Sequence, residues 1–257
     1  MRYLIISDIH SNLAAFEAVL ADAGSFDKVW CLGDVVGYGP DPNECVEQLR
    51  DLPHVCVVGN HDWAALGNMD TEDFNPDAQK ACHWTREQLS PSNLEYLETL
   101  PKSLVEEDFT LVHGSPRHSI WEYILYPSIA EANFEYFDTR FCLVGHTHVP
   151  IIYRHRPENP AQACDTMSPP LSSPPHGGEK RRGMVLGEER LIINPGSVGQ
   201  PRDGDPRASY AILNSDRERS DLTLQYRRIS YPIETTQAKM VEKGLPVRLI
   251  IRLGYGW

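Results

Sequence analysis

Short apolar runs recur along the first 150 residues, and each run leads directly into polar residues. Runs of this length bounded by glycine are typical of strands that are buried on both faces. Helical spacing of apolar residues separates the first three runs, at residues 12–23 and 43–50. This alternation predicts a βαβαβ start with a parallel sheet and right-handed crossovers. The five strands expected in this half of the chain span residues 3–6, 28–32, 55–58, 109–112 and 141–144.

The pattern of apolar and polar residues changes between the third and fourth of these strands and again after the fifth. Residues 63–104 carry little strand signal, which predicts a helical excursion beside the sheet. Helices are expected at residues 76–89, 92–100, 128–137 and 233–243. Short runs at 151–153, 191–193, 210–213 and 222–226 follow one another without helices, which favours a second, more antiparallel sheet. The tail at 247–253 fits either a strand or a short helix.

We expect one domain that spans residues 1–257. Within it, residues 156–189 differ in composition from the rest. The segment is rich in proline, serine, glycine and charge, and has little apolar surface to bury. Such a segment cannot offset its ordering entropy, so we expect a mobile insertion. The basic run at 180–182 could be a docking patch, although a solvated run of charge is the simpler interpretation.

Composition limits the class of protein. A hydrophobic content of 41% supports a core, and no apolar run approaches the length of a membrane span. The chain enters its first strand without room for a signal peptide, and six cysteines without a Cys-x-x-Cys pair favour reduced, buried thiols. We therefore expect a cytoplasmic protein that does not act at a membrane. A net charge of −12 makes an extended nucleic acid an unfavourable partner.

The polar residues that follow the five strands are of one chemical kind. Open α/β sheets place their ligand sites at strand ends, and mixed Asp, Asn and His ligation suits hard and borderline divalent metals. One such cluster is a weak signal, but five at strand exits predict a metal site. The clusters are Asp8-Ile9-His10, Gly33-Asp34, Gly59-Asn60-His61-Asp62, His113-Gly114 and Gly145-His146-Thr147-His148.

These motifs, in this order, resemble those of the calcineurin-like metallophosphoesterases, and in particular the small bacterial and archaeal phosphodiesterase-type members. The resemblance covers residues 2–155 and 190 to about 253. It implies an α/β fold, a four-layer α/β/β/α sandwich of two mixed sheets flanked by helices, with the metal site at the C-terminal ends of the strands. It also implies two divalent metal ions, for which Mn, Fe, Zn and Ni all suit the ligands.

The resemblance assigns a role to each motif residue. Asp8, His10 and His148 would bind the first metal, Asp34 would bridge both, and Asn60, His113 and His146 would bind the second. His61 would be the catalytic histidine near the leaving group. Asp62 would orient His61, or would instead cap a following helix. The candidates for substrate binding are Asn12, Tyr38, Asn194 and Arg202.

One position departs from related enzymes. Protein Ser/Thr phosphatases and diadenosine polyphosphatases of this superfamily carry an arginine shortly after the Gly-Asp motif, where this chain has Tyr38. The loss of a bidentate phosphate-binding group counts against those two activities. Arg202 could replace it, or could simply be an exposed arginine.

The charge of the predicted centre favours a phosphate ester. Two divalent cations bring four positive charges against the two negative charges of Asp8 and Asp34. We expect a small phosphate ester, most simply a diester, to be hydrolysed by a hydroxide that bridges the metals. The alternatives are a phosphomonoesterase acting on a phosphoprotein or nucleotide, and a non-catalytic binding scaffold with this fold. The complete ligand set with His61 favours the enzyme, and an apolar edge strand could mediate a homodimer.

Overall fold

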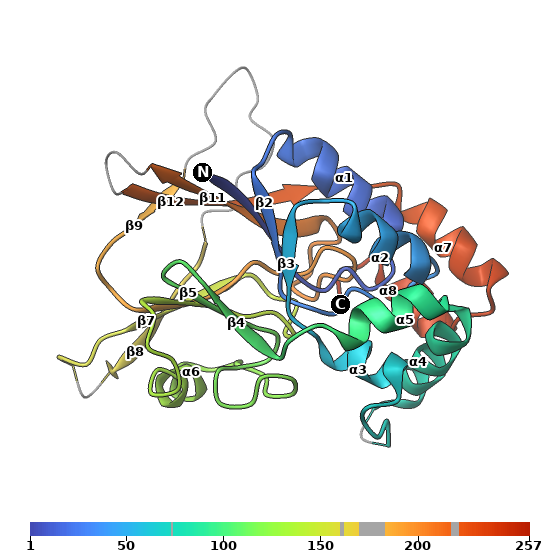
Figure 1. Ribbon diagram of the computed structural model, residues 1–257, viewed down its shortest axis with the longest axis horizontal. Coiled ribbons are helices and arrows are strands. Elements are labelled where there is room, and N and C mark those ends of the chain that lie inside the picture. The colour runs from blue at the N-terminus through green and yellow to red at the C-terminus, as the bar shows by residue number, and fades with distance from the viewer. Residues whose placement is uncertain (73, 160–161, 170–182, 217–220) are drawn as a thin grey trace.

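The computed structural model describes residues 1–72, 74–159, 162–169, 183–216 and 221–257 as two six-stranded sheets packed face to face (Figure 1). In spatial order the first sheet contains β3 (His54–Cys56), β2 (Lys28–Cys31), β1 (Arg2–Ile6), β11 (Ala208–Asp216), β12 (Asp221–Ile229) and β9 (Met184–Leu186). The second contains β4 (Ser103–Glu106), β5 (Phe109–Val112), β6 (Phe141–Leu143), β10 (Leu191–Asn194), β7 (Ile151–His155) and β8 (Cys164–Met167).

Both sheets are mixed, which confirms the expected sandwich. In the first, β1, β2 and β3 are parallel, whereas β11 runs antiparallel to β1. In the second, β5, β6 and β10 are parallel, whereas β7 runs antiparallel to β10. The grouping of the later strands into one sheet of their own is wrong, because β11 and β12 extend the first sheet while β7 and β10 extend the second.

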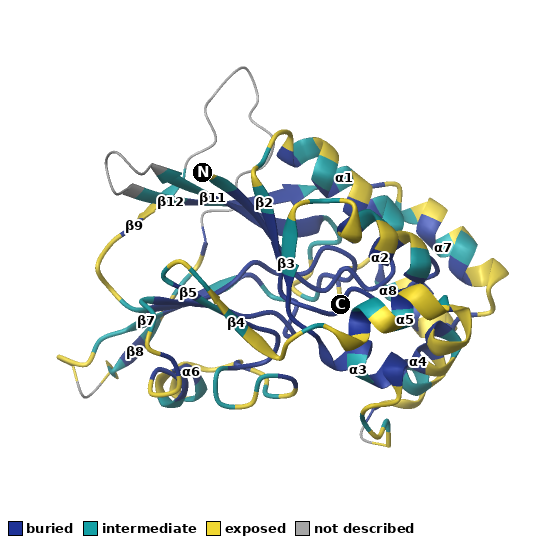
Figure 2. Cartoon of the chain, in the orientation of Figure 1, coloured by how far each residue is buried: buried dark blue, intermediate teal, exposed yellow. Residues whose placement is uncertain are grey.

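Alternation of side chains along the strands places the core on both faces of each sheet. On β1, Tyr3 and Ile5 point toward the second sheet, and Leu4 and Ile6 point toward the covering helices. Aromatic rings fill the layer between the sheets: Trp30 stacks on Tyr3 with centroids 4.3 Å apart and contacts Phe109 at 5.2 Å. The central strands of both sheets are accordingly buried along most of their length (Figure 2).

Helices cover the outer faces. α1 (Leu13–Ala23) and α2 (Pro42–Arg50) pack on the first sheet, and α6 (Pro127–Asn133) packs on the second. The excursion forms α3 (Asn60–Leu66), α4 (Pro76–Gln88) and α5 (Pro91–Glu98), which lie near α7 (Ile233–Glu242) and α8 (Val247–Arg252) (Figure 1). The ambiguous tail is therefore helical. The local sequence stabilises the start of α4, because Asn75 accepts a hydrogen bond from the Ala78 amide and Pro76 occupies the first turn.

The insertion at 156–189 is not irregular throughout. Its described residues include β8 and β9, which add an edge strand to each sheet. The basic run at 180–182 lies outside the described residues. All six cysteines are free and buried, as expected. No helix in the described part of the chain has the length and apolar character needed to span a bilayer.

Candidate metal centre

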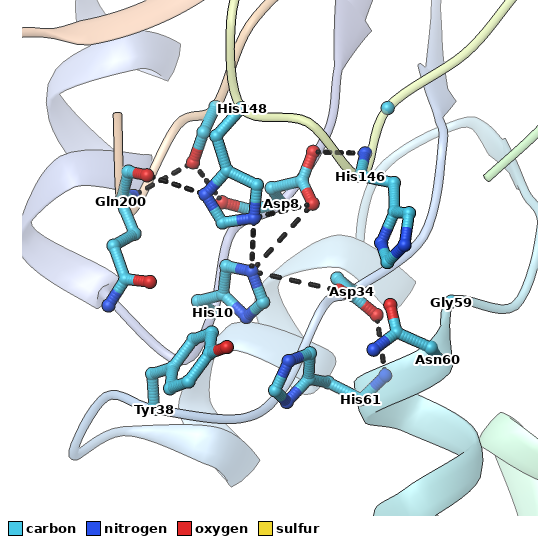
Figure 3. A network of polar contacts seen from close by, with 12 residues as sticks. Asp8, His10, Asp34, Tyr38, Gly59, Asn60, His61, His146, His148 and Gln200 are labelled. Atoms are coloured by element: carbon cyan, nitrogen blue, oxygen red, sulfur yellow. Dashed lines mark hydrogen bonds and ion pairs between the residues drawn. The ribbon is translucent and has the colours of Figure 1, made fainter. Parts of the chain in front are cut away.

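All seven predicted metal ligands lie together where strands of both sheets end. Figure 3 labels all of them except His113. The first sheet delivers four of them, after β1, β2 and β3, and the second sheet delivers three, after β5 and β6. The centre therefore sits across the junction of the two sheets. In chain order the ligand candidates are Asp8, His10, Asp34, Asn60, His113, His146 and His148.

The first group consists of Asp8, His10 and His148, whose candidate ligand atoms all lie within 4.8 Å of one another. The Nε2 atom of His148 is 3.2 Å from Asp8 Oδ1 and 3.1 Å from His10 Nε2. These three side chains are almost completely buried. Their donor atoms face one point, as the ligands of a cation must.

The second group consists of Asp34, His113 and His146, again within 4.8 Å of one another. His113 Nε2 is 3.3 Å from Asp34 Oδ2, 3.2 Å from His146 Nδ1 and 3.0 Å from Asn60 Oδ1. The two groups meet at Asp34, because its Oδ2 atom also lies 3.6 Å from His10 Nε2. Asp34 therefore occupies the position expected of a bridging ligand.

Two buried carboxylate oxygens test whether these residues fit a pair of cations. Asp8 Oδ1 and Asp34 Oδ2 have no hydrogen-bond partner. A buried charged oxygen without a partner costs several kcal/mol or more, so such atoms are rare in native proteins unless an ion satisfies them. One orphan oxygen belongs to each group, and each group contains two imidazole nitrogens. The donor set fits two divalent ions.

Backbone carbonyl groups hold each ligand histidine in one orientation. His10, His113 and His148 direct Nδ1 at Val36 O (3.2 Å), Leu32 O (2.8 Å) and Gln200 O (2.5 Å). His146 is reversed, with Nε2 at 3.2 Å from Trp121 O. Because a carbonyl can only accept, the facing nitrogen carries the proton and the other nitrogen is free to bind metal. The first three would bind through Nε2 and His146 through Nδ1.

The backbone at the ligands is strained. Asp8, His10, Asp34, His146 and His148 all have positive φ, between 49° and 64°, a region that side chains other than glycine adopt infrequently. Such residues cost about 1–3 kcal/mol each and persist where the surrounding structure enforces them. Their concentration at one point marks a functional site independently of the ligand chemistry.

Opposite charges set the protonation of the carboxylates. Burial alone would raise the pKa of Asp8, but the nearby His148 ring lowers that pKa to about 2. At Asp34 burial likewise raises the pKa, but nearby groups, chiefly His113, outweigh it and the pKa is lowered. Burial lowers the pKa of His10 and of His146, which favours the neutral, metal-binding imidazole.

His61 lies beside the ligands without belonging to either group. Its backbone N–H donates to Asp34 Oδ1 at 2.8 Å, and its ring contacts the rings of Tyr38 and His10 at centroid distances of 4.2 and 5.0 Å. The ring Nδ1 atom is 3.3 Å from the thiol sulfur of Cys82 on α4. Nothing in the local sequence pointed to Cys82 as the neighbour of this histidine.

Asp62 does not make the contact with His61 that an orienting partner requires. Its two carboxylate oxygens accept hydrogen bonds from Gly59 N at 2.9 Å and Val36 N at 3.0 Å. The first closes the N-terminus of α3 and the second fixes the loop after Asp34. These contacts fit the alternative role, that of a helix cap. Asp62 therefore affects the position of His61 through α3.

Two of the four substrate-binding candidates belong to the framework of the site. Asn12 caps α1 and donates to Gly199 O at 2.9 Å, and Asn194 donates to Gly145 O at 2.6 Å. Both asparagines are buried, and both oxygen and nitrogen of each amide have partners within the protein. We therefore assign them to the loops that carry the ligands instead of to the substrate.

The other two candidates, Tyr38 and Arg202, lie at the mouth of the centre. Arg202 Nη2 is 3.4 Å from the Tyr38 hydroxyl. Beside Tyr38 a pocket of about 140 Å³ is lined by uncharged side chains, apart from any charge on His61. Its other lining residues include Phe74, Trp121 and Tyr123, which sequence reasoning did not single out. The lining residues are Tyr38, Asn60, His61, Phe74, Asn75, Ala78, Trp121 and Tyr123.

Comparison with known proteins agrees with this geometry. Residues 1–218 match the model of the calcineurin-like phosphoesterase superfamily domain. The chain belongs to that superfamily. The expected fold and the expected class of enzyme, a metal-dependent phosphoric ester hydrolase, are thereby confirmed, and the structure contains two candidate metal-binding groups.

Two relatives of this phosphoesterase extend over nearly its whole length, and a third matches about a third of it. A crystal structure of a metallophosphoesterase from Sphaerobacter thermophilus is 50% identical, with a TM-score of 0.83 and coverage of 100% of this chain and 99% of that one. The uncharacterised protein MJ0912 of Methanocaldococcus jannaschii is 39% identical over 98% of this chain and 97% of its own. A symmetrical bis(5′-nucleosyl)-tetraphosphatase of Photorhabdus laumondii is 30% identical over 34% of this chain and 38% of its own.

Proposed function

We propose that this phosphoesterase hydrolyses phosphodiesters at a dinuclear metal centre. The observation that carries the proposal is the pair of buried carboxylate oxygens, Asp8 Oδ1 and Asp34 Oδ2, each unpartnered and each facing two imidazoles. Asp8, His10 and His148 would hold one divalent ion, Asn60, His113 and His146 the other, with Asp34 between them. When bound, two such ions activate water and neutralise charge on the phosphoryl oxygens.

His61 would assist the departure of the leaving oxygen as its proton donor. It is fixed at both ends: its backbone by Asp34 and its ring Nδ1 by Cys82 at 3.3 Å. If Cys82 donates its S–H to Nδ1, the proton of the neutral ring lies on Nε2, which can donate a hydrogen bond to the leaving oxygen. Burial lowers the pKa of His61 to about 4, so the ring must gain a second proton before it can transfer one to that oxygen. General-acid assistance of this kind contributes about 10²–10⁴-fold to the rate, and most when the leaving group is a poor one.

The uncharged pocket beside His61 supports a diester over a monoester. A diester has a second organic group to place, and a pocket lined by Phe74, Trp121 and Tyr123 can bury a planar, neutral one. Phe74 and Trp121 already stack, with ring centroids 5.3 Å apart. The similarity to tetraphosphatases, whose named substrate joins two nucleosides through phosphate, adds support for two organic groups.

Three further features remain part of the proposal. Manganese is our first choice of metal, because carboxylate, amide and imidazole ligands suit it, and iron, zinc and nickel are the alternatives. The cytoplasm is the proposed compartment, because all six cysteines are unpaired. A homodimer is testable by measuring the mass in solution.

A paired assay tests the proposed reaction. Manganese-loaded protein is given bis-(p-nitrophenyl) phosphate and p-nitrophenyl phosphate side by side, with Asp34→Asn as the inactive control. Faster diester cleavage that disappears in the variant is the expected result. Faster monoester cleavage would make a phosphomonoester the substrate class in place of a diester. If neither ester were cleaved with metal bound, a non-catalytic binding scaffold would be the better explanation.

The role of His61 has its own test. Methyl p-nitrophenyl phosphate and methyl phenyl phosphate differ in leaving group only. His61→Ala is expected to slow the phenyl ester by about 10²-fold or more and the p-nitrophenyl ester much less, because the poorer leaving group needs the proton. His118→Ala, which removes an exposed histidine, is the matched control. Equal losses on both esters would remove the acid role from His61.

A further inference from the structure

Two arginines at the mouth of the site form no ion pair with a carboxylate of the described residues. Arg202 follows the loop after β10, and Arg252 ends α8. Their guanidinium carbons lie 5.9 Å and 4.9 Å from the centroid of the same ring, that of Tyr38. Two positive charges thus converge on one tyrosine in a protein whose net charge is −12.

Their nitrogen atoms are unusually poorly satisfied. Arg202 Nε and both Nε and Nη2 of Arg252 are buried without a hydrogen-bond partner. Arg202 Nη2 makes long contacts, at 3.4 Å, with both Tyr38 Oη and Gln200 Oε1, and the Arg202 side chain also hydrogen-bonds the Tyr123 side chain. Within the described residues, the Nη1 atom of Arg252 is neither hydrogen-bonded nor in this buried set, so solvent or a ligand can reach it.

Other arginines with a buried, unpartnered Nε show what is missing here. Arg117, Arg227 and Arg228 each form an ion pair with a carboxylate, those of Glu122, Asp22 and Asp203. Among the ion pairs of the described residues, none involves Arg202 or Arg252. Two adjacent, partly buried cations with no carboxylate between them repel each other, so the fold bears a cost that an anionic ligand would remove.

The pair stands close to the proposed centre of reaction. The ring of Tyr38 lies 4.6 Å from that of His10 and 4.2 Å from that of His61, so the guanidinium groups are one side chain away from the metal ligands. Burial, with repulsion from Arg202 added to it, lowers the pKa of Arg252 to about 10, and both groups remain charged at neutral pH. A ligand bound at the metals could extend past Tyr38 to reach them.

We infer that Arg202 and Arg252 form a second anion-binding subsite, which holds a further phosphate group of the substrate. Guanidinium groups bind phosphate oxygens through charge-assisted hydrogen bonds, and the accessible Nη1 atom of Arg252 supplies such donors while Arg202 adds its positive charge. The inference rests on the proposed function and narrows its substrate class. The preferred phosphodiester would carry a second, non-reacting phosphate, as a nucleotide with phosphates on two hydroxyl groups does.

The test uses two substrates that differ in that phosphate alone. Thymidine 5′-(p-nitrophenyl phosphate) and its 3′-phosphorylated form release the same chromophore. Manganese-loaded protein is expected to show a kcat/KM about tenfold or more higher for the 3′-phosphorylated substrate, as one charge-assisted contact allows. Arg252→Met should abolish this preference and change the rate on the simpler substrate little. Arg248→Met removes an exposed arginine from the same helix and should behave as the wild type.

Equal rates on the two substrates, or an equal loss on both in Arg252→Met, would overturn the subsite while leaving the proposed hydrolysis intact. Calorimetric titration of the manganese-loaded protein with thymidine 3′,5′-bisphosphate and thymidine 5′-monophosphate needs no turnover. Tighter binding of the bisphosphate, lost in Arg252→Met, would support the subsite even if neither ester were cleaved. Equal affinity for the two nucleotides would refute it.

A structural role for Arg252 predicts the opposite change in stability. If its charge served folding, Arg252→Met would lower the melting temperature. Because the arginine is unpaired and repelled by Arg202, and methionine retains the apolar stem, we expect the melting temperature to stay unchanged or to rise. A variant that is as stable as the wild type but has lost the preference for the second phosphate separates function from folding.

Discussion

Gly59 precedes two residues of the site, and replacing it with alanine should disable the centre while leaving every ligand residue in place. A Cβ atom at this position would lie 2.0 Å from Asp34 Oδ1 and 2.4 Å from Asp34 N. Side-chain Cβ atoms do not approach other heavy atoms closer than 3.0 Å, so one group must move by about 1 Å. Asp34 has little freedom to do so, because its Oδ1 atom also accepts a hydrogen bond from His61 N at 2.8 Å.

The magnitude follows from the displacement. A misplacement of about 1 Å can reduce turnover about 10²-fold, and overpacking costs about 1–3 kcal/mol of stability. Asp34 joins the two ligand groups, so Gly59→Ala should also reduce the metal bound per chain. The assays are metal analysis after dialysis, diester hydrolysis and thermal unfolding.

A matched variant controls for the added methyl group. A Cβ atom at Gly187 would have no heavy atom within 4 Å, and this glycine does not have a positive φ, so Gly187→Ala should match the wild type in all three assays. If Gly59→Ala bound two metals and hydrolysed the diester within about twofold of the wild type, the tight packing of Gly59 against Asp34 would not matter for function, and the reasoning would be refuted.

Three other predictions test separate parts of the structure. Removing metal with a chelator should lower the melting temperature by about 5–10 °C per lost ion, because an ion at about 100 times its Kd contributes about 2.7 kcal/mol and each kcal/mol shifts a domain of this size by about 2–4 °C; an unchanged melting temperature after confirmed metal loss would contradict the centre. Cys82→Ala should reduce hydrolysis of a phenyl diester more than that of a p-nitrophenyl diester, since it frees the His61 ring, and Cys82→Ser should restore part of the loss. Burial alone would raise the pKa of Glu122, but hydrogen bonds from Arg117, Asn133 and Ser115 lower it to about 2. The carboxylate therefore contributes stability that is present above about pH 4.3, the ordinary value, and is lost as the pH falls toward 2. Glu122→Gln should be less stable than the wild type at pH 7, and a difference in melting temperature that failed to shrink between pH 5 and pH 2 would disprove this.

The ligand positions were predictable because their signal is local. A buried strand followed by Asp, Asn or His is visible in a window of a few residues, and strand ends meet at one edge of the fold. The αβ order of the first 60 residues and the helix starts at Asn75 and Ser90 were predictable for the same reason. Edge strands were not, because β4 alternates exposed and half-buried residues and has no apolar run.

Contacts between distant segments were not predictable. The sequence does not say that β11 pairs with β1, some 200 residues earlier, as well as with β12, the next strand in the chain. It does not show that Asp62 accepts a hydrogen bond from an amide of the loop after Asp34, or that Cys82 approaches His61 from another helix. Arg252 lay in a tail whose conformation was ambiguous, and its relation to Arg202 exists only once α8 is packed.

The left-handed backbone at five ligand positions has a consequence for the evolution of the fold. Each of these residues makes the protein less stable than glycine would at the same position, so selection for stability alone would remove them. Catalysis is what retains them. In a lineage that no longer needs hydrolysis, substitutions at these five positions would be favoured first, and the descendant would become a sturdier, inert protein. Substitutions that abolish activity in this fold would therefore also raise its stability. The retention of the strained turns indicates that selection maintains the activity.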